Sequence, residues 1–268
     1  MNAKQLSILG CGWLGLPLAK SLIEKGWSVK GSTTSVAKME ALKEEGIIPY
    51  LIELSQNQVS GEFKDFLQGS EILIINIPPQ IKTSEGPFIE KMKVLMPIIK
   101  SSTISKLLFV SSTSVYSDKD VVITEKSLRD GTTESGKQLV ETEQYLENLD
   151  FLQTTIVRFG GLIGAGRNPA KYLAGRQGVD SPNAAVNLID QQDCIGIIQA
   201  IIDKEAWGTS FNAATPDHPS KKDYYNKKTS ESNLEPPSFD YSNLGTGKII
   251  SSEKLIKELD YHFKTTKL

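Results

Sequence analysis

The chain has 268 residues, of which 39% are hydrophobic and 23% are charged, and its formal net charge is −2. This composition is typical of a globular protein with a sizeable core, and the nearly balanced charge excludes the basic footprint of a nucleic-acid-binding protein. No apolar run reaches the roughly 18 residues of a membrane span, and the first ten residues lack a signal-peptide pattern, so we expect no membrane partner. The two cysteines and two histidines are scattered singly, so we expect neither a disulfide framework nor a bound metal. A cytoplasmic protein is therefore expected.

Apolar segments alternate with helical patterns through the first 160 residues. Strands are predicted at residues 5–9, 28–31, 47–52, 72–77, 107–110 and 154–157. Helices are predicted at residues 14–25, 35–45, 88–100 and 137–149, with Pro97 as an alternative end of the third. Because the strands are apolar throughout and separated by helices, the pattern predicts a parallel sheet covered on both faces.

After residue 158 the pattern loosens. The glycine-rich stretch 159–167 is predicted as a loop, 190–204 as a helix, 210–214 as the end of a strand, and 215–238 as loop with one short helix. A short strand and a helix follow within 247–261, with Ser251 as the predicted N-cap. The prediction is an α/β fold, a Rossmann-type doubly wound parallel sheet with a smaller C-terminal lobe. The first domain takes residues 1–160 with parts of 185–205 and 248–262, and the discontinuous lobe takes mainly 161–268.

The segment "ILGCGWLG" brings three glycines together where the first strand ends. In such a loop Gly10 permits the tight turn, Gly12 lets the backbone approach a pyrophosphate, and Gly15 lets the next helix pack closely on the strand. The position between a strand and a helix supports a dinucleotide site, with Trp13 and Leu14 in the same loop. The alternative is a plain strand–helix turn.

The second strand ends in "VKGSTTS", which lacks the Asp or Glu that usually contacts the ribose hydroxyls of NAD. The hydroxyls of Ser32, Thr33, Thr34 and Ser35 and the nearby Lys38 would not repel a 2′-phosphate, whereas a carboxylate would. We therefore expect NADP or NAD as the cofactor, with NADP favoured. Alternatively these hydroxyls only cap the next helix, as Ser35 can do in either case.

The motifs "GCGWLG", "FVSSTSVYS", "RFGGLIGAGR", "NLIDQQD" and "FNAATPDHP" follow one another along the chain. Together they resemble landmarks of the extended short-chain dehydrogenases/reductases, the NAD-dependent epimerase/dehydratase proteins, and the tail "GKIISSEKLIKELDY" resembles an atypical bacterial subgroup. The resemblance spans residues 6–262. It implies an NAD(P)-binding first domain, a substrate-binding lobe, and an oxidoreductase, epimerase or dehydratase acting on a small hydroxylated or nucleotide-sugar-like substrate.

The resemblance also assigns roles to single residues. Ser112 matches the catalytic Ser/Thr that hydrogen-bonds the reacting hydroxyl or carbonyl. Asn76 matches the end of the fourth strand beside the cofactor, and Pro78 and Ser111 are further candidate cofactor-binding residues. The alternatives are a serine-rich strand end that satisfies backbone groups and an Asn that forms a turn before the prolines.

The resemblance breaks at the pair that normally moves the proton, a Tyr followed one helical turn later by a Lys. In "TTESGKQLVETE" the best register puts Ser135 and Leu139 at these positions, and a shifted register keeps Lys137 but puts Thr133 at the tyrosine. Lys137 either binds the cofactor ribose or is an ordinary solvated residue. Tyr116 is the candidate stand-in for the tyrosine, and its alternative is packing against the sheet.

A second departure concerns the substrate. Val186 occupies the position where sugar-nucleotide epimerases place an arginine before the motif that reads "LIDQQD" here. Arg167 is the candidate replacement for binding an anionic substrate, with Lys171 and Arg176 nearby. The alternative is a solvated basic face. Asp193, in the same motif, is expected to cap or pack.

Two functions therefore compete. The first is an NAD(P)-dependent enzyme of the epimerase/dehydratase type, and the second is a non-catalytic NADP-binding sensor or regulatory module, which the missing Tyr–Lys pair favours. The family often forms dimers through two helices per subunit, so a homodimer through 88–100 and 137–149 is expected. The first of these helices carries more apolar residues than one sheet face requires, although the same residues could be ordinary core: Phe88, Met92, Leu95, Met96 and Ile99.

Overall fold

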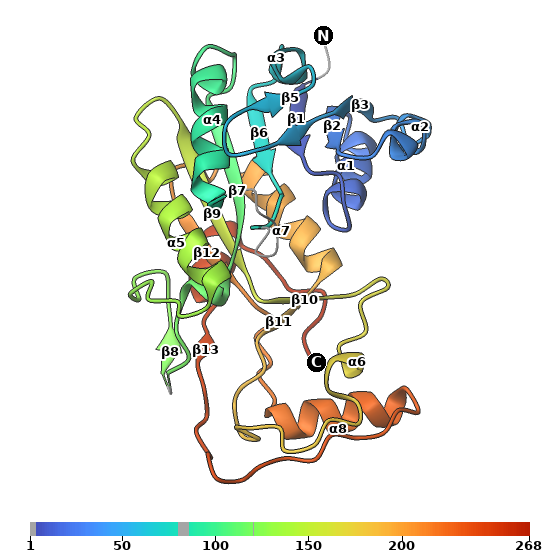
Figure 1. The fold of residues 1–268 in the computed structure, drawn as a ribbon, viewed down its shortest axis with the longest axis vertical. Coiled ribbons are helices and arrows are strands. Elements are labelled where there is room, and N and C mark those ends of the chain that lie inside the picture. The colour runs from blue at the N-terminus through green and yellow to red at the C-terminus, as the bar shows by residue number, and fades with distance from the viewer. Residues whose placement is uncertain (1–3, 80–85, 120) are drawn as a thin grey trace. The chain divides into compact units, whose positions relative to one another are not determined.

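A seven-stranded parallel sheet organises the fold (Figure 1). The computed structural model describes residues 4–79, 86–119 and 121–268. The strands lie in the order β3 (Ile48–Leu51), β2 (Ser28–Thr33), β1 (Gln5–Leu9), β6 (Ile72–Ile75), β7 (Lys106–Ser112), β9 (Gln153–Phe159) and β12 (Ser210–Ala213). This arrangement confirms the predicted Rossmann-type, doubly wound sheet.

The order of the strands reverses at β1. The chain passes from β1 to β2 and β3 on one side, and then returns to place β6 and β7 on the other. Since crossovers between parallel strands are right-handed, the connections on the two sides cover opposite faces of the sheet. The loops that follow β1 and β6 therefore diverge at the carboxyl edge, where doubly wound folds bind ligands.

Burial on both faces explains the composition of the central strands. All four residues of β6 are buried, as are the last four of β1. The register pairs Leu6 of β1 with Val29 on one side and with Ile72 on the other. An apolar residue is therefore needed at nearly every position, which is why the sequence reads as continuous apolar runs.

Most helices of the described residues lie where the sequence periodicity predicts a helix. They are α1 (Gly15–Glu24), α2 (Met39–Glu44), α3 (Phe63–Leu67), α4 (Phe88–Lys100), α5 (Glu134–Glu147), α6 (Ala170–Leu173), α7 (Gln191–Asp203), α8 (Lys221–Glu231) and α9 (Glu253–Leu259), with short 3-10 turns at η1 (Val36–Lys38) and η2 (Thr113–Val115). Helices α4 and α5 pack against one another, and the Phe88 N–H donates to Gln138 Oε1 across them (3.2 Å). Gln199 of α7 donates to Ser21 Oγ of α1 (2.7 Å).

Several boundaries differ from the sequence prediction. Strand β2 continues to Thr33, and the helix predicted at 35–45 is a 3-10 turn followed by α2. Pro97 does not end α4, because the burial of Met96 and Ile99 offsets the backbone hydrogen bond that the proline removes. Strand β6 ends at Ile75, so that Asn76 lies in the loop that follows it.

Short two-stranded pairs complete the fold. They are β4 (Glu53–Leu54) with β5 (Val59–Ser60), β8 (Val122–Ile123) with β13 (Ile249–Ile250), and β10 (Gly161–Ile163) with β11 (Leu188–Asp190). The prediction of a loop throughout 159–167 was wrong at β10, where Leu162 pairs with the buried Ile189. The long-range partner makes a strand of a glycine-rich stretch that has little local strand propensity.

The N-cap of α9 is also corrected. The residue at that position is Ser252, whose hydroxyl instead bonds both the N–H and the carbonyl of Ala214 (2.9 and 2.8 Å). Ser251 lies one residue earlier, and its Oγ accepts from the Glu253 N–H at 3.3 Å. The predicted Ser251 hydroxyl therefore contacts the first helical turn without occupying the N-cap.

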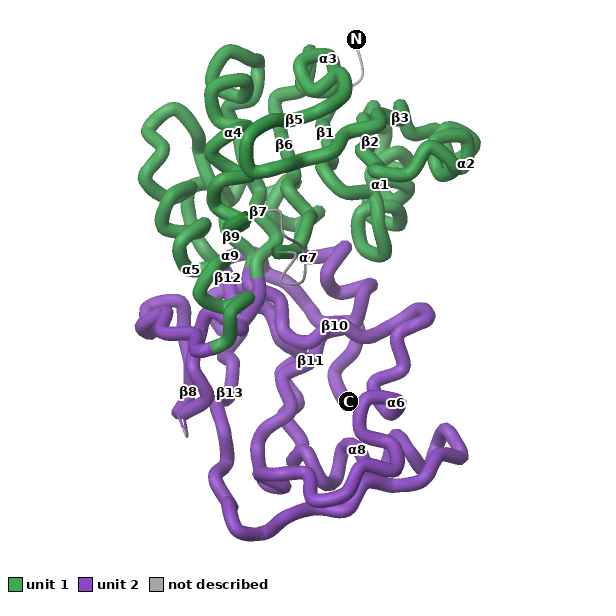
Figure 2. The backbone as a smooth tube through the Cα atoms, viewed as in Figure 1, with its two compact units in different colours: residues 1–111, 133–157, 198–210 green, residues 112–132, 158–197, 211–268 purple. Residues whose placement is uncertain are grey.

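The chain forms two compact units (Figure 2). Unit 1 comprises residues 1–111, 133–157 and 198–210, and unit 2 comprises 112–132, 158–197 and 211–268. The predicted division, which assigned 112–132 and parts of 185–205 and 248–262 to the first domain, stays a prediction.

The apolar face of α4 is buried within the chain. Each residue on which the homodimer prediction rested is covered: Phe88, Met92, Leu95, Met96 and Ile99. These side chains leave no exposed stripe on α4 that a second copy would need to cover. The homodimer stays a prediction.

Candidate dinucleotide site

The three glycines after β1 are required for different reasons. Gly10 has a φ of +105°, and a Cβ there would lie 2.6 Å from the Asn76 carbonyl oxygen. A Cβ on Gly15 would lie 2.2 Å from the Gly10 carbonyl oxygen, so this glycine allows α1 to approach the loop. A Cβ on Gly12 would meet nothing within 4 Å. Gly12 therefore borders open space, where a bound group can approach the backbone.

Side chains from two neighbouring strands hold this loop in place. The Gly10 N–H donates to Ser32 Oγ at the end of β2 (2.9 Å), and Asn76 Nδ2 donates to the Gly10 carbonyl from the loop after β6 (3.0 Å). The Cys11 N–H donates to the Ser32 carbonyl (2.8 Å). These three backbone groups of the turn are thus satisfied without a ligand, which fixes the shape of the turn at Gly10 and Cys11 before a ligand binds.

The start of α1 suits an anion. Its N-cap residue, Leu14, provides no side-chain hydrogen bond, and the first turn contains no acidic residue. The N–H groups and the positive end of the helix dipole are therefore not neutralised by this helix itself. Such a helix start, following a glycine turn, is a common phosphate site.

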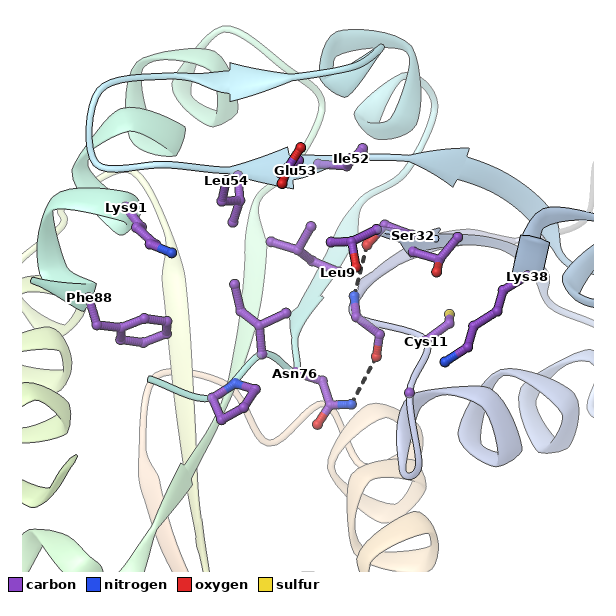
Figure 3. A pocket seen from close by; sticks show the side chains of 16 residues that line it. Leu9, Cys11, Ser32, Lys38, Ile52, Glu53, Leu54, Asn76, Phe88 and Lys91 are labelled. Carbon is purple, nitrogen blue, oxygen red and sulfur yellow. Dashed lines mark hydrogen bonds between the residues drawn. The ribbon is translucent and has the colours of Figure 1, made fainter. Parts of the chain in front are cut away.

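A cavity of about 350 Å³ lies at this edge of unit 1 (Figure 3). Of the predicted cofactor residues, it is lined by Gly10, Gly12, Thr33, Thr34, Asn76 and Pro78. Its other lining residues are Leu9, Cys11, Ser32, Lys38, Ile52, Glu53, Leu54, Ile77, Phe88 and Lys91. The cavity therefore extends from the glycine loop across the ends of β2, β3 and β6 to helix α4.

The charges of the cavity are unevenly placed. Lys38 is exposed, and no described residue pairs with its amine. Figure 3 shows this side chain extending toward the glycine loop, on the side opposite Lys91. Burial raises the pKa of the Cys11 thiol to about 12, so at neutral pH this residue presents an uncharged wall to the cavity.

The remaining predicted cofactor residues of unit 1 do not line the cavity. Leu14 and Gly15 are buried where α1 begins, and Trp13 lies in the turn before them. Ser111 Oγ donates to the buried carboxylate of Glu143 (2.5 Å). Lys137 is exposed on α5.

Helix α5 carries the positions where the family pair was expected. Leu139 is buried on it and Ser135 is half-buried, while the Thr133 hydroxyl accepts from the Gly136 N–H (3.0 Å) as the N-cap. Thr133 is thus already engaged in starting the helix.

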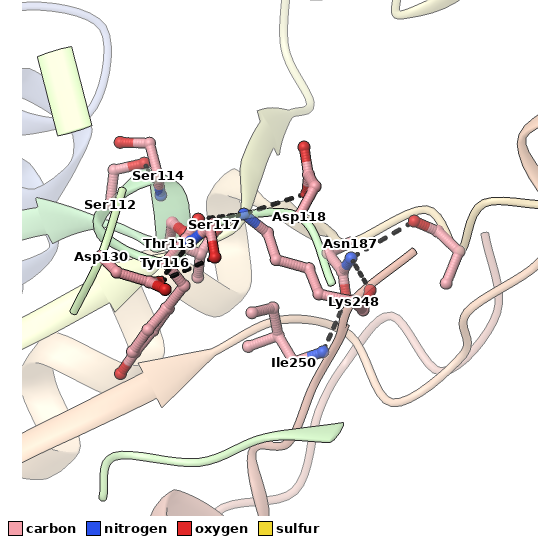
Figure 4. A network of polar contacts seen from close by, with 11 residues as sticks. Ser112, Thr113, Ser114, Tyr116, Ser117, Asp118, Asp130, Asn187, Lys248 and Ile250 are labelled. Carbon is pink, nitrogen blue, oxygen red and sulfur yellow. Dashed lines mark hydrogen bonds and ion pairs between the residues drawn. The ribbon is translucent and has the colours of Figure 1, made fainter. Parts of the chain in front are cut away.

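The two candidate catalytic residues belong to unit 2 (Figure 4). Ser112 ends β7, and its Oγ accepts from the Ser114 N–H (3.2 Å) as the N-cap of η2. Tyr116 is only 2% exposed, its hydroxyl donates to Asn212 Oδ1 (2.9 Å), and it accepts from Arg158 Nη1 (2.8 Å). The Tyr116 hydroxyl is therefore engaged on both sides by buried partners, whereas Ser112 remains half-buried.

A distant lysine fixes the turn that begins at Ser112. Lys248 Nζ donates to the carbonyls of Tyr116 (2.7 Å) and Thr113 (3.3 Å), and it pairs with Asp118 (3.2 Å), as Figure 4 shows. Asn187 holds the segment that contains Lys248. Its Nδ2 donates to the Lys248 carbonyl, and its Oδ1 accepts from the Ile250 N–H (both 2.8 Å). Sequence reasoning did not identify Lys248, because nothing local connects it to the turn.

Arg167 lies in a tight turn of unit 2. It is exposed, and its N–H donates to the Gly164 carbonyl (2.9 Å). Val186, at the expected arginine position, is buried and packs with Tyr224. The position therefore serves the core of unit 2, and an anionic substrate would need another cation.

Some residues of the cavity were missed by the sequence reasoning. Glu53 comes shortly after β3, whose residues pair with those at the end of β2, so a correct register for β2 and β3 would have indicated it. Lys91 lies on the buried face of α4, where a charged side chain is not expected.

Every helix in the described ranges is either too short or too polar to cross a membrane.

A glycine turn between a buried parallel strand and a helix, opening into a cavity at the reversal of strand order, defines a dinucleotide-binding protein of the Rossmann type. The model of one protein family, described as the NAD binding domain of 6-phosphogluconate dehydrogenase, matches residues 5–142. Protein YeeZ of Escherichia coli (strain K12) is 34% identical over 267 residues, which cover 97% of this chain and 96% of that protein. The chain belongs to this NAD-binding family, together with Protein YeeZ.

Solved structures share the fold across nearly the whole chain. A functionally unknown conserved protein from Silicibacter pomeroyi DSS has a TM-score of 0.80 at 22% identity, covering 98% of this chain and 94% of that one. UDP-glucuronic acid 4-epimerase from Bacillus cereus, solved in complex with NAD, has a TM-score of 0.81 at 15% identity, covering 97% and 92%. At these identities the likeness concerns the fold.

Proposed function

We propose that the chain is an NAD(P)-dependent enzyme of the epimerase/dehydratase type, acting on a small hydroxylated or nucleotide-sugar-like substrate. The observation that carries the proposal is the cavity at the glycine loop, where Gly12 borders open space and α1 presents an uncapped start. The fold shared with UDP-glucuronic acid 4-epimerase supports the substrate class. When bound, a nicotinamide supplies the acceptor or donor of a hydride.

In this proposal the glycine loop binds the pyrophosphate, and the end of β2 selects the dinucleotide. Thr33, Thr34 and Lys38 line the cavity where an NAD-specific carboxylate is absent. A lysine amine that no described residue pairs with is suited to a 2′-phosphate, because a charge-assisted hydrogen bond is stronger than a neutral one. The cofactor favoured by these residues is NADP.

Calorimetric titration with NADPH, NADP, NADH and NAD tests this preference. We expect the phosphorylated forms to bind about tenfold more tightly, and Lys38→Met to remove the difference. Lys43→Met, a change on α2 away from the cavity, is the matched control. Equal affinities in the unchanged protein, or a preference for NAD, would refute the NADP assignment.

The chemistry is assigned to Ser112, which would hydrogen-bond the reacting hydroxyl or carbonyl. The usual Tyr–Lys pair is proposed to be absent, since Ser135 and Leu139 occupy its positions and Leu139 is buried. Tyr116 is a weak replacement, because Asn212 and Arg158 already engage its hydroxyl. Arg167 is the exposed cation proposed for an anionic substrate group.

The buried Leu139 supports a second candidate, a non-catalytic NADP-binding sensor. A substrate screen that monitors nicotinamide absorbance, with UDP-glucuronic acid among the sugars, separates the two. Substrate-dependent absorbance changes that Ser112→Ala abolishes and Tyr116→Phe retains are expected for the enzyme. Tight dinucleotide binding with no change for any substrate favours the sensor.

A further inference from the structure

The turn after β7 is held through one particular peptide group. Lys248 Nζ donates to the Thr113 carbonyl (3.3 Å) and, more closely, to the Tyr116 carbonyl (2.7 Å). The Thr113 carbonyl belongs to the same peptide group as the Ser114 N–H, and this N–H donates to Ser112 Oγ (3.2 Å). Two hydrogen bonds therefore lead from the lysine ammonium, through one peptide group, to the candidate catalytic hydroxyl. Figure 4 shows the side chains of Ser112 and Ser114 together, away from the stem of Lys248.

The ammonium acts on the charge of this peptide group as well as on its position. The Lys248 side chain is only 13% exposed, so water screens its charge poorly where it meets the Thr113 carbonyl. Its ion-pair partner Asp118 is 85% exposed, so water screens the carboxylate more strongly. A positive charge at a carbonyl oxygen draws electrons from the N–H of the same peptide group, and hydrogen bonds linked in this way strengthen one another. The Ser114 N–H is therefore a stronger donor than an ordinary turn amide.

The fold fixes the lysine itself. Lys248 directly precedes β13, and Asn187 bonds the backbone there at the Lys248 carbonyl and at the Ile250 N–H (both 2.8 Å). All three protons of the amine have a partner, in two carbonyls and one carboxylate. The charge is thus in place before any substrate binds, and it needs no reorganisation during a reaction.

We infer that Lys248 is a positioning residue for Ser112, acting through the peptide group between Thr113 and Ser114. This group occupies one lone pair of Ser112 Oγ. No described residue accepts the proton of the Ser112 hydroxyl, so the hydroxyl can donate it to a carbonyl or oxyanion of the substrate. The inference rests on the proposed function, in which Ser112 contacts the reacting group.

The first experiment observes the peptide group itself and needs no substrate. Nuclear magnetic resonance of protein labelled with 13C at threonine carbonyls and with 15N at serine amides restricts the spectrum to the few Thr–Ser pairs of the chain. Ser114→Ala identifies the signal of Thr113 and Ser114 by removing it. We expect Lys248→Met to move the Thr113 carbonyl carbon and the Ser114 amide proton upfield, and to speed hydrogen exchange at this amide by about tenfold or more.

Matched variants separate this local effect from a general loss of stability. Lys248→Arg retains the charge and the donors, so exchange at Ser114 should stay within about threefold of the unchanged protein. Lys119→Met removes a neighbouring lysine, which pairs with Asp130 instead, and it should leave the signal unmoved. Lys248→Gln removes the charge but keeps a donor, and it replaces Lys248→Met if that variant does not fold. The Ser114 amide proton should move upfield in Lys248→Gln as well.

Two spectroscopic results would overturn the inference. One is an unmoved signal of Thr113 and Ser114 in the folded variant. The other is an equal rise in exchange at Ser230 on α8, because a general loss of stability would then explain the result.

Kinetics connect the positioning to the reaction. With a substrate found by the absorbance screen, Lys248→Met should lower kcat by about tenfold and leave KM within about twofold, because Ser112 acts in the transition state. Lys248→Arg should restore most of the loss. Equal kcat values in Lys248→Met and Lys119→Met would overturn the positioning role. If the unchanged protein turns over no substrate, the proposed enzymatic function fails, whereas the spectra still decide whether Lys248 holds Ser112.

Discussion

Neighbouring glycines in the loop after β1 have opposite tolerance for a side chain. Gly15 is enclosed by the Gly10 carbonyl, whereas Gly12 faces open space at the cavity. The three glycines of the motif are therefore constrained for two different reasons. Gly10 and Gly15 are needed by the folded chain, whereas nothing in the folded chain requires a glycine at position 12, where we propose that the dinucleotide binds.

Alanine at each glycine separates these constraints. We expect Gly15→Ala to lower the free energy of unfolding by about 2 to 3 kcal/mol, because its Cβ would overlap the Gly10 carbonyl oxygen. Gly12→Ala should leave it unchanged within about 0.5 kcal/mol. Urea unfolding monitored by circular dichroism measures both. Equal losses in the two variants would contradict this division.

Individual site residues differ in how far the sequence predicts them. Thr33, Thr34 and Asn76 were found because they directly follow or end strands that local patterns indicate. Ser32 was named with them, but the hydrogen bond that its Oγ accepts from the Gly10 N–H depends on the register of β1 and β2, which no local pattern gives. Lys91 was missed because a buried lysine contradicts the polarity expected of that helix face.

At the scale of elements, a buried carboxylate joins α7 to the segment after α9. Asp193 is fully buried at the start of α7, and it accepts from the Tyr261 hydroxyl (2.9 Å), the Lys264 N–H (2.7 Å) and the Thr265 N–H (3.0 Å). The predicted structural role of Asp193 thus takes a specific form. Its carboxylate caps the distant tail segment.

Asp193→Ala should therefore be strongly destabilising. Removing the buried acceptor leaves two part-buried N–H groups and the Tyr261 hydroxyl without this partner, and we expect a loss of about 3 kcal/mol in the free energy of unfolding. Asp203→Ala, at the exposed end of α7, removes only a surface ion pair with Lys25 and should cost less than about 1 kcal/mol. Chemical denaturation of both variants measures this difference. Similar losses in the free energy of unfolding would contradict the stabilising role of the hydrogen bonds between Asp193 and the tail segment.

Three buried or half-buried tyrosines, on α8 and in the tail segment, make the stability of the fold depend on pH. Burial raises the pKa of Tyr224, Tyr225 and Tyr261 above the ordinary value of 10.0, with Asp193 adding to the shift at Tyr261. The folded chain thus retains protons that the unfolded chain releases. This stabilising contribution is complete below pH 10.0 and is lost as the pH rises toward the folded-state pKa values.

Tyr224→Phe tests this dependence without removing a hydrogen bond. The Tyr224 hydroxyl is buried and has no partner among the described residues, so the change should be neutral or stabilising by up to about 1 kcal/mol at neutral pH. The loss of stability between about pH 8 and about pH 10.5 should also become smaller. Tyr241→Phe, which alters an exposed ring, is the control. An unchanged pH dependence in Tyr224→Phe would contradict the assignment.

Among elements, those with strong local periodicity were predicted and those created by distant pairing were not. Strands β1 and β6 follow from continuous apolar runs, and α4 and α5 from helical spacing. The pairs β8–β13 and β10–β11 each join short segments from far apart in the chain, and no local sequence pattern predicts them. The same applies to the contacts of Lys248 with the turn after Ser112.

At the scale of the whole molecule, the alternation of strands and helices was sufficient to predict the doubly wound sheet. It was not sufficient to divide the chain, because each of the two units is assembled from three separate segments. Residues 112–132 belong to unit 2, and Glu125 among them accepts from the Asn212 N–H, much later in the sequence. Which unit a segment belongs to therefore depends on tertiary contacts, and the sequence pattern does not predict these contacts.

The reversal of strand order links this fold to its proposed use. It opens the cavity between the loops after β1 and β6, and the glycine turn supplies the part that faces a phosphate. Binding there would stabilise the folded chain by mass action, in proportion to the logarithm of the dinucleotide concentration. The central claim is that this cavity binds the dinucleotide through Gly12 and its neighbours.

The most direct test is calorimetric titration of the unchanged protein and of Gly12→Asp with NAD and NADP. Since a Cβ at Gly12 meets nothing, the variant should fold with unchanged stability, yet place a carboxylate where the pyrophosphate binds. We predict binding to the unchanged protein and a loss of at least about a hundredfold in Gly12→Asp. Equal affinity in a folded variant, or no binding of either dinucleotide to the unchanged protein, would contradict the assignment of the cavity.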